Sequence, residues 1–278
     1  MDTGSREKIP ALPSASVYHR FFIESAKAFV NLKNELGPER LALLLKVNRI
    51  DLDHIRVGEK LVIPDDLSDP MRLAPFPREI QRLRAIPKFV LVSQQVQAFG
   101  AYQDGWLTRW GPTSTGKRST PTPAGLFFMN WKSKQTVSTE DSSWVLKWYV
   151  NIDNRRGVSF HQYELPGYPA SHACVRLQED DARWLYEWSI QWLITSNGRE
   201  VLANGTAVVV LGEYPWGQPA PWKQLPEDPR ATQVSEAEVD EVLAGYLATI
   251  YERQQEWDDY LPRPAADSAL GNGFVSPP

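Results

Sequence analysis

One cysteine and two nearby histidines are the residues of this chain best suited to covalent chemistry. Cys174 is the only cysteine, and His161 and His172 both lie within 13 residues of it. A thiol titrates at a pH of about 8.5, so a nucleophilic cysteine needs a neighbouring imidazole or another positive charge to form its thiolate at neutral pH. On a strand, His161 shares one face with Ser159. In an extended stretch, His172, Cys174 and Arg176 also share one face, and Arg176 could favour the thiolate or hold a substrate carboxylate.

Spacing alone leaves two other interpretations of Cys174 open. A lone cysteine is most often a small buried hydrophobic side chain. A His-x-Cys pair with a further histidine could instead ligate zinc, but no fourth ligand stands at a familiar spacing. We therefore expect no metal and no cofactor, and a single cysteine cannot form an intrachain disulfide.

The segment that contains these residues resembles the signature of the YkuD family of L,D-transpeptidases. That signature is a histidine, a short connection and Ser/Thr-His-Gly-Cys, followed by a hydrophobic residue and Arg or Asn. Here His161 is followed by residues 171–176, which read Ser-His-Ala-Cys-Val-Arg. Further family motifs occur in order over residues 87–213: an opening strand at 89–93, an Asp-Gly hairpin at 104–105, Ser-Thr-Gly at 114–116, Thr-Pro-Thr-Pro-Ala-Gly at 120–125 and a closing strand from 205. Two positions depart from the pattern. Ala173 replaces glycine, which it can do unless φ must be positive, and Gln162 replaces Gly or Ala.

The resemblance implies a thioester mechanism on peptidoglycan stem peptides. Cys174 would attack the carbonyl of the third residue of a stem tetrapeptide, and His161 would take the thiol proton. The terminal D-Ala would leave, with His172 lining the site and assisting proton transfer. The Gln162 carbonyl would orient the imidazole, and the N–H groups of Ala173 and Cys174 would bind the oxyanion. The Ser171 hydroxyl would fix the loop, and the Arg176 guanidinium would shape the pocket and bind a substrate carboxylate.

The sequence leaves the acyl acceptor open. A side-chain amine of a second stem would give a 3→3 cross-link in cell wall biogenesis, which maintains cell shape. Water would make the protein an L,D-carboxypeptidase, and a protein lysine would anchor a lipoprotein. The expected partners are donor and acceptor stem peptides. A non-catalytic peptidoglycan-binding module that keeps the fold is the alternative from another functional class.

The N-terminal part resembles the second half of a LysM module. Residues 38–64 read as helix, turn, helical turn and short strand, with five matching positions: Asn48, Gly58, Leu61, Ile63 and Pro64. Before them, apolar spacing predicts a helix over 17–36, which Gly37 and Pro38 end. The opening strand of a LysM module is not visible before Phe29. The resemblance implies either binding to glycan strands or a structural remnant.

Strand-like alternation with turn signals predicts a mainly β fold. We expect a YkuD-like β-sandwich with one or two packed helices, a small α-rich LysM-like N-terminal region and a C-terminal helix over 235–257. A helical pattern also covers 180–193. The expected organisation is a helical and LysM-like region over 1–66, a Pro-rich linker with little internal structure over 67–86, a catalytic domain over 87–213, a Pro-rich segment and helix over 214–261, and a disordered tail over 262–278.

One insertion within the catalytic region is rich in aromatic residues. Residues 131–150 contain Trp131, Trp144, Trp148 and Tyr149 between the family motifs. This segment either borders the cleft as a lid or packs its aromatic rings into the core.

Composition bears on partners and on location. The formal net charge of −4 gives no global attraction to nucleic acid or to an anionic membrane. The apolar runs are far shorter than the ~20 residues of a membrane span. Residues 1–16 lack the pattern of a secretory signal, whereas the implied substrate lies outside the cytoplasmic membrane. We therefore expect a cell-envelope protein, periplasmic or extracytoplasmic, whose export signal is missing from this chain.

Overall fold

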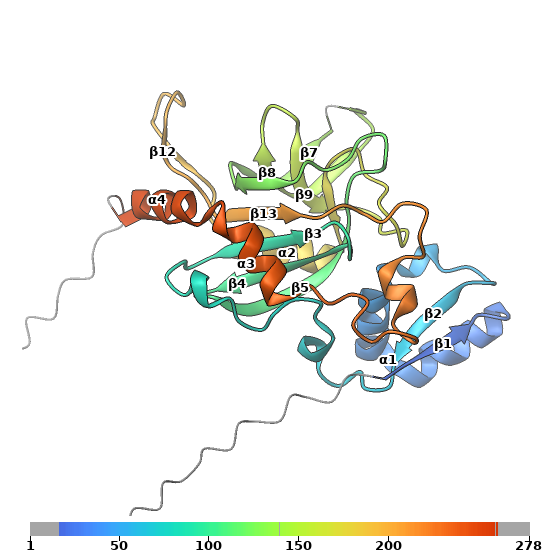
Figure 1. Cartoon of the computed structure of the whole chain (residues 1–278). Coiled ribbons are helices and arrows are strands. Elements are labelled where there is room, and N and C mark those ends of the chain that lie inside the picture. Colours follow the sequence, from blue (N-terminus) through green and yellow to red (C-terminus); the bar gives the residue numbers. More distant parts are fainter. Residues whose placement is uncertain (1–16, 139, 259, 261–278) are drawn as a thin grey trace, which may run out of the picture.

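A large curled β-sheet, with helices on its faces, forms the centre of the protein. The computed structural model describes residues 17–138, 140–258 and 260, and the tail expected over 262–278 lies outside these residues. Residues 17–64 form a smaller region that packs beside this sheet (Figure 1). The expected mainly β architecture is confirmed.

The main sheet has nine strands among the described residues. Their spatial order is β6 (Gly125–Phe128), β13 (Ala207–Leu211), β3 (Phe89–Ser93), β4 (Ala98–Gln103), β5 (Trp106–Ser114), β10 (Val175–Leu177), β9 (Val158–Gln162), β8 (Val145–Asp153) and β7 (Lys132–Val137). The pairs β13–β3 and β10–β9 are parallel, and the other pairs are antiparallel. A separate two-stranded ribbon joins β11 (Leu193–Ile194) to β12 (Val201–Ala203).

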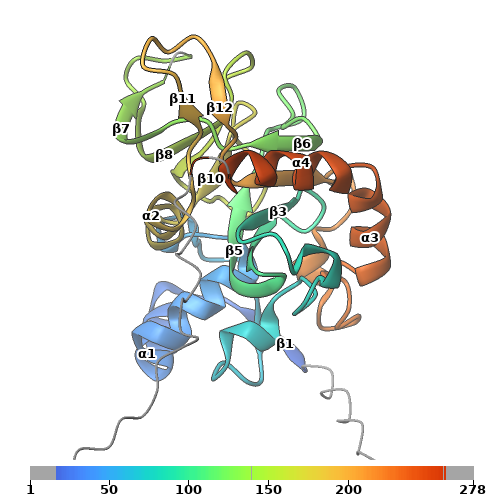
Figure 2. The same cartoon turned by 90° about the vertical axis from the view of Figure 1, so that its left-hand side faces the viewer.

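The central strands are buried on both faces, which explains their continuous apolar runs. Phe89 and Leu91 of β3 contribute to one core, together with side chains of α3 (Glu236–Ala244) and α4 (Leu247–Asp258). Val90 and Val92 of the same strand contribute to the other core, which also holds side chains of α2 (Glu179–Trp188). Figure 2 shows α2 and the α3–α4 pair on opposite sides of these strands. The C-terminal helix expected over 235–257 is therefore present, but as two helices that meet near Gly245.

The hairpin between β4 and β5 follows local turn chemistry. Asp104 and Gly105 have φ values of 50° and 79°. Positive φ at both central residues matches the right-handed twist of the flanking strands, and an Asp-Gly pair adopts this conformation readily. The hairpin predicted from the sequence is confirmed.

The N-terminal region begins with a strand, so the helix expected over 17–36 is wrong at its start. β1 (Tyr18–Phe22) pairs antiparallel with β2 (Lys60–Pro64). The Ser25 hydroxyl accepts from the N–H of Ala28, and this cap starts α1 (Ala26–Asn48) only at residue 26. Gly37, at φ 71° and ψ 174°, breaks α1 as predicted. A short 3₁₀ turn, η1 (Leu52–His54), precedes β2. The opening strand that the sequence did not reveal is thus present, while the LysM resemblance itself stays a prediction.

The expected linker is an ordered part of the main core. It contains two 3₁₀ turns, η2 (Pro70–Leu73) and η3 (Gln81–Leu83). The fourth 3₁₀ turn of the described chain, η4 (Pro221–Gln224), follows β13 in the sequence. Phe76, Ile80 and Ile86 are buried in the same cluster as β3. The expectation of little internal structure over 67–86 is therefore wrong. The prolines prevent regular helices and strands, but the apolar side chains between them still pack on the sheet.

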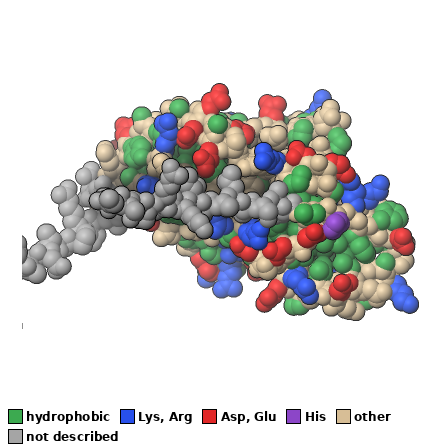
Figure 3. Space-filling model, turned by 60° about the horizontal axis from the view of Figure 1, so that its bottom comes forward, with side chains coloured by type: hydrophobic (Ala, Val, Ile, Leu, Met, Phe, Trp, Pro, Cys, Tyr) green, Lys and Arg blue, Asp and Glu red, His purple; other side chains and the backbone are tan. Residues whose placement is uncertain are grey.

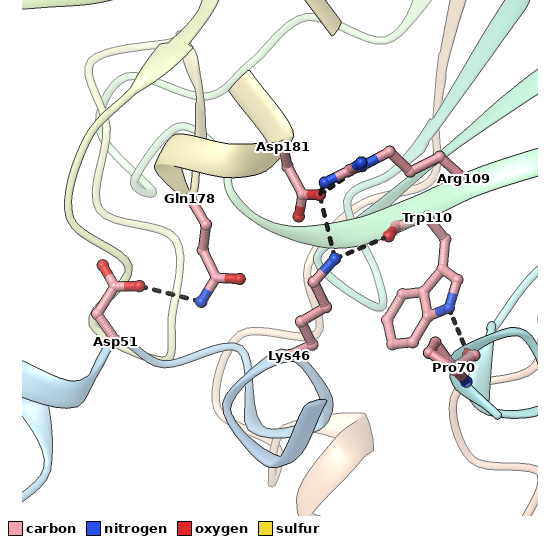
Figure 4. Close-up of polar contacts among 7 residues, drawn as sticks. All are labelled: Lys46, Asp51, Pro70, Arg109, Trp110, Gln178 and Asp181. Carbon is pink, nitrogen blue, oxygen red and sulfur yellow. Dashed lines mark hydrogen bonds and ion pairs between the residues drawn. The ribbon is translucent and has the colours of Figure 1, made fainter. Parts of the chain in front are cut away.

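A polar junction, defined as Lys46, Arg109 and Asp181, connects the N-terminal region to the sheet. Asp181 of α2 is fully buried, and its Oδ1 lies 3.1 Å from Lys46 Nζ and 2.7 Å from an Arg109 guanidinium nitrogen (Figure 4). A Cβ at Gly111 would lie 2.2 Å from the Asp181 carboxylate, so this approach requires glycine. The junction joins α1, β5 and α2.

A second contact reaches the segment that precedes the cysteine. The Asp51 carboxylate accepts from the N–H of Leu165 at 2.7 Å and from the Gln178 amide at 3.2 Å. The backbone N–H of Asp51 also donates to the Leu165 carbonyl at 2.8 Å. The N-terminal region therefore holds the connection between β9 and β10 directly.

Charges of both signs are mixed on the surface. On the face shown in Figure 3, acidic and basic side chains are interspersed. Within the described part of the chain, no helix combines the length and the apolar character that crossing a membrane requires.

Candidate active site

The parallel pair β9–β10 brings the candidate residues together. Its register places Phe160 beside Val175 and His161 beside Arg176. Phe160 and Val175 point into a buried core, so by alternation Ser159, His161 and Arg176 point to the opposite face. Ser159 is level with the residue before Val175, which is the cysteine. The sheet thus positions all of these side chains at one end of two adjacent strands.

The cysteine itself lies in a bend. Residues 172–174 form this bend, β10 begins only at Val175, and Ala173 has a φ of 72°. The expectation that His172 and Cys174 share a face of an extended stretch is therefore wrong, although both line the same cleft. A non-glycine residue in the left-handed region costs about 1–2 kcal/mol. Ala173 thus adopts, with strain, a conformation that favours glycine, which is the residue at this position in the YkuD signature.

Hydrogen bonds from the motif segment at 114–122 hold this bend. The Ser171 carbonyl accepts from the N–H of Lys117 at 2.9 Å. The Thr122 hydroxyl donates to the Ala173 carbonyl at 2.9 Å, and the Ser171 hydroxyl donates to the Cys174 carbonyl. The two motifs that the sequence analysis singled out therefore fix the backbone on which the cysteine sits.

This packing also orients the peptide group before the cysteine. A Cβ at Gly116 would lie 2.2 Å from the Thr120 carbonyl oxygen, so glycine lets the motif loop close tightly. Because the Ala173 carbonyl points toward Thr122, the N–H of Cys174 in the same trans peptide points the opposite way. That N–H is thereby turned away from the motif loop.

His161 has a defined tautomer. Its Nδ1 lies 3.0 Å from the Gln162 carbonyl oxygen, which can only accept, so Nδ1 carries the proton and Nε2 is a free base. Burial lowers the pKa of His161 to about 4; the Gln162 carbonyl opposes this shift, and the positive charge of Arg176 adds to it. The imidazole is therefore neutral at pH 7 and able to accept a proton at Nε2.

Cys174 is a partly buried thiol at rest. Burial raises the pKa of this thiol, while hydrogen bonds from Ser159 and the charge of Arg176 act to lower it. The Sγ atom lies 3.2 Å from the Ser159 hydroxyl and 3.4 Å from the Gly157 carbonyl oxygen. These contacts and a hydrogen bond from the Ser159 backbone, rather than one with His161, are the hydrogen bonds of Sγ within the described chain.

His172 is paired with a residue that the sequence analysis did not identify. Lys117 Nζ lies 2.7 Å from His172 Nε2. An ammonium can only donate, so Nε2 accepts and the ring proton sits on Nδ1. That Nδ1 is buried and has no hydrogen-bond partner among the described residues. The Trp144 ring lies 5.1 Å from the His172 ring, measured between centroids.

These groups open onto a cleft of about 350 Å³. Its walls come from β7, β8, the turn between β8 and β9, and the cysteine bend. The aromatic, charged and titratable residues that line it include Glu140, Trp144, Tyr149, Arg155, His161, Tyr163, His172, Cys174 and Arg176. The Arg176 guanidinium lies 4.4 Å from the centroid of the Tyr163 ring. The cleft therefore offers a thiol, a neutral base and cationic groups side by side.

The aromatic insertion divides between the cleft and the body of the protein. Residues 131–150 form most of the β7–β8 hairpin, and Trp131, Trp144 and Tyr149 line the cleft. Trp148 instead packs against Tyr186 of α2, at 5.6 Å between ring centroids. The segment thus borders the cleft with some of its aromatic rings and packs another against the body of the protein. Its motion as a lid stays a prediction.

Several residues at the site escaped the sequence analysis, among them Lys117, which contacts His172, and Arg155 and Glu140, which line the cleft. Lys117 follows the Ser-Thr-Gly motif directly, and that position is a signal that could have identified it. Arg155 lies in the turn just before Gly157, and Glu140 lies in the hairpin loop, where no local pattern marks them. Within the described residues, no group of three or more His, Cys, Asp or Glu side chains is arranged to hold a metal ion.

One comparison with known proteins matches the region that contains this cleft. Residues 87–210 match the family model of YkuD, the L,D-transpeptidase catalytic domain. The comparison with curated proteins gives no match.

Three similar solved structures are L,D-transpeptidases. One from Stackebrandtia nassauensis is 24% identical with a TM-score of 0.38, over 46% of this chain and 57% of that chain. One from Mycobacterium smegmatis is 20% identical with a TM-score of 0.37, over 45% and 59%. L,D-transpeptidase 1 of Mycobacterium tuberculosis is 24% identical with a TM-score of 0.35, over 45% and 62%. The similarity thus spans less than two thirds of each of these proteins.

The family match covers both strands and the bend that hold His161, Cys174 and Arg176. Residues 87–210 of this chain therefore form a YkuD domain, the catalytic domain of the L,D-transpeptidases.

Proposed function

We propose that the protein is a cysteine-dependent L,D-transpeptidase that acts on peptidoglycan stem peptides in cell wall biogenesis. The observation that carries the proposal is the arrangement in the cleft. A partly buried thiol in the bend before β10, a neutral histidine with a free Nε2 on β9 and an arginine on β10 line one cleft of a YkuD domain. The site of action would be the cell envelope, where this substrate occurs.

The first step is acylation of Cys174. His161 Nε2 takes the proton from Sγ, and the thiolate attacks the carbonyl carbon of the third stem residue. The carbonyl oxygen becomes an oxyanion, which the N–H groups of Ala173 and Cys174 are proposed to bind. The C–N bond to the terminal D-Ala then breaks, and the imidazolium returns its proton to the leaving amine. The products are a Cys174 thioester and free D-Ala.

The second step transfers the acyl group to an amine. The side-chain amine of a second stem attacks the thioester carbonyl, and an imidazole takes the proton that the nitrogen loses. The new amide is the 3→3 cross-link, and the thiol is restored. His172 lines the same cleft beside Lys117, which supports its proposed part in these proton transfers.

The cationic groups suit a substrate with free carboxylates. Arg176 has a ring face and one backbone carbonyl, at 3.5 Å from Glu164, as its nearest polar contacts. Its guanidinium therefore keeps donors available for a carboxylate of the stem peptide. Arg155 lines the same cleft and adds a second cation.

Intact-protein mass spectrometry tests the proposal. The protein is incubated with a purified disaccharide tetrapeptide, and separately with a carbapenem. We expect the wild-type mass to rise by the mass of the donor less D-Ala in the first case, and by that of the carbapenem in the second. Cys174→Ala should remain unmodified in both cases. A wild-type protein that forms neither adduct, or a Cys174→Ala variant with full activity, would contradict the proposal.

A further inference from the structure

Ser159 is a buried hydroxyl whose hydrogen-bond partner is the proposed nucleophile. It lies in the middle of β9, and its side chain has no exposed surface. Its Oγ lies 3.2 Å from Cys174 Sγ, and this contact is the hydroxyl's hydrogen bond within the described residues. A buried hydroxyl is unfavourable unless it is paired. The thiol of Cys174 thus provides the hydrogen-bond partner that the buried Ser159 hydroxyl needs.

The neighbouring carbonyl determines which atom donates. Sγ also lies 3.4 Å from the Gly157 carbonyl oxygen, which can only accept a hydrogen bond. The single thiol proton therefore points to Gly157. The hydrogen bond between Ser159 and Cys174 must then run from the hydroxyl to the sulfur.

We propose that Ser159 is a positioning residue that donates a hydrogen bond to Cys174 Sγ and keeps donating it when the thiolate forms. The inference rests on the proposed function, in which Cys174 is the nucleophile. When His161 takes the proton from Sγ, the S–H bond to the Gly157 carbonyl is lost, whereas Ser159 keeps its own proton. The remaining O–H···S⁻ bond becomes charge-assisted and therefore stronger. Ser159 thus stabilises the thiolate in a partly buried site.

The other charged and titratable groups of the cleft do not replace this bond. Those that face Cys174 are His161 and Arg176 on the adjacent strands, His172 in the bend, Arg155 and Arg156 in the β8–β9 turn, Tyr149 on β8, Glu140 in the hairpin loop, and Tyr163 after β9. Arg176 favours the thiolate through its charge, and Glu140 opposes it. None of these groups makes a hydrogen bond with Sγ in the described structure.

The pH dependence of alkylation measures this effect directly. Cys174 is the only thiol of the chain, so the rate of modification by iodoacetamide reports on it alone. The variants are Ser159→Ala and, should that protein fail to fold, Ser159→Gly. The matched control is Thr113→Val, which removes another fully buried hydroxyl that has no hydrogen-bond partner in the described structure. Thermal unfolding of each variant verifies that it is folded.

We expect loss of the Ser159 hydroxyl to raise the midpoint of the alkylation profile by about one pH unit, which slows modification about tenfold at pH 7. The Thr113→Val profile should match the wild type. An unchanged midpoint in a folded Ser159 variant, or an equal shift in Thr113→Val, would overturn the inference. If the wild type is alkylated but forms no adduct with tetrapeptide or carbapenem, the proposed function fails, while the alkylation profiles still decide the role of Ser159.

Discussion

The polar junction and the cleft both bury polar groups beside the same sheet, but they pair them differently. In the junction, Oδ1 of Asp181 accepts from both Lys46 and Arg109, so the carboxylate charge is compensated, although Oδ2 has no hydrogen-bond partner among the described residues. In the cleft, Cys174 and His161 are both neutral, and Nδ1 of His172 lacks a partner among the described residues. A buried charge that is already compensated holds elements together. Neutral groups that line a cleft can instead bind a substrate and exchange protons with it.

Loss of the base should have the largest effect on activity. His161→Ala removes the free Nε2, and we expect the rate of acylation to fall about 10²–10⁴-fold, the usual contribution of a general base. The measurement is the rate of adduct formation in single turnover. His19→Ala, an exposed histidine of β1, serves as the control and should keep the wild-type rate. An unchanged rate in His161→Ala would remove His161 from the mechanism.

Loss of the junction carboxylate should act on stability instead. Asp181→Ala leaves Lys46 and Arg109 partly buried without their counter-charge, and we expect the free energy of unfolding to fall by about 3–5 kcal/mol. Denaturant unfolding measures this change. Glu187→Ala removes an exposed ion pair from the same helix and should leave the midpoint unchanged. Equal losses in the free energy of unfolding for the two variants would show that the junction stabilises the protein no more than an exposed ion pair does.

Acidification should destabilise the protein through His161. Its pKa is about 4 in the folded protein and about 6.5 when unfolded, so between these values the unfolded chain binds more protons. Stability is therefore complete above pH 6.5 and falls as the pH drops toward 4, by about 3 kcal/mol from this group. Unfolding curves of wild type and His161→Ala across this range isolate the contribution. A variant with the same slope as the wild type would contradict it.

Relief of strain at the cysteine bend should have the smallest effect. Ala173→Gly removes a Cβ from a residue at φ 72°, and we expect a gain in stability of about 0.5–1 kcal/mol with the rate of acylation retained. Ala182→Gly in α2, where the backbone is helical, should lose about 1 kcal/mol instead. Thermal unfolding compares the two. A loss of stability in Ala173→Gly would mean that the bend carries no strain.

The parts of the molecule that local chemistry determines were predictable. The Asp104–Gly105 hairpin, the alternation that turns His161 away from the core and the break at Gly37 all follow from residue types within a few positions. The order of the motifs also predicted five of the residues that line the cleft, His161, Ser171, His172, Cys174 and Arg176, because the resemblance supplied contacts that spacing could not.

The parts that depend on distant contacts were not predictable. The strand β1 exists because it pairs with β2, some forty residues later, and the segment over 67–86 is ordered because the main core accepts its side chains. Lys117 meets His172 across 55 residues of sequence. The positive φ of Ala173 depends on the loop that Thr122 holds, and nothing in the local sequence indicates it.

The central claim, that Cys174 carries the acyl group, is tested most directly by a burst experiment. Enzyme at high concentration is mixed with the tetrapeptide donor in the absence of an amine acceptor, and free D-Ala is counted against active thiol. The account predicts a burst of one D-Ala for each Cys174, and no burst after Cys174 has been alkylated. Release of D-Ala by the alkylated protein, or no release by the intact one, would contradict it.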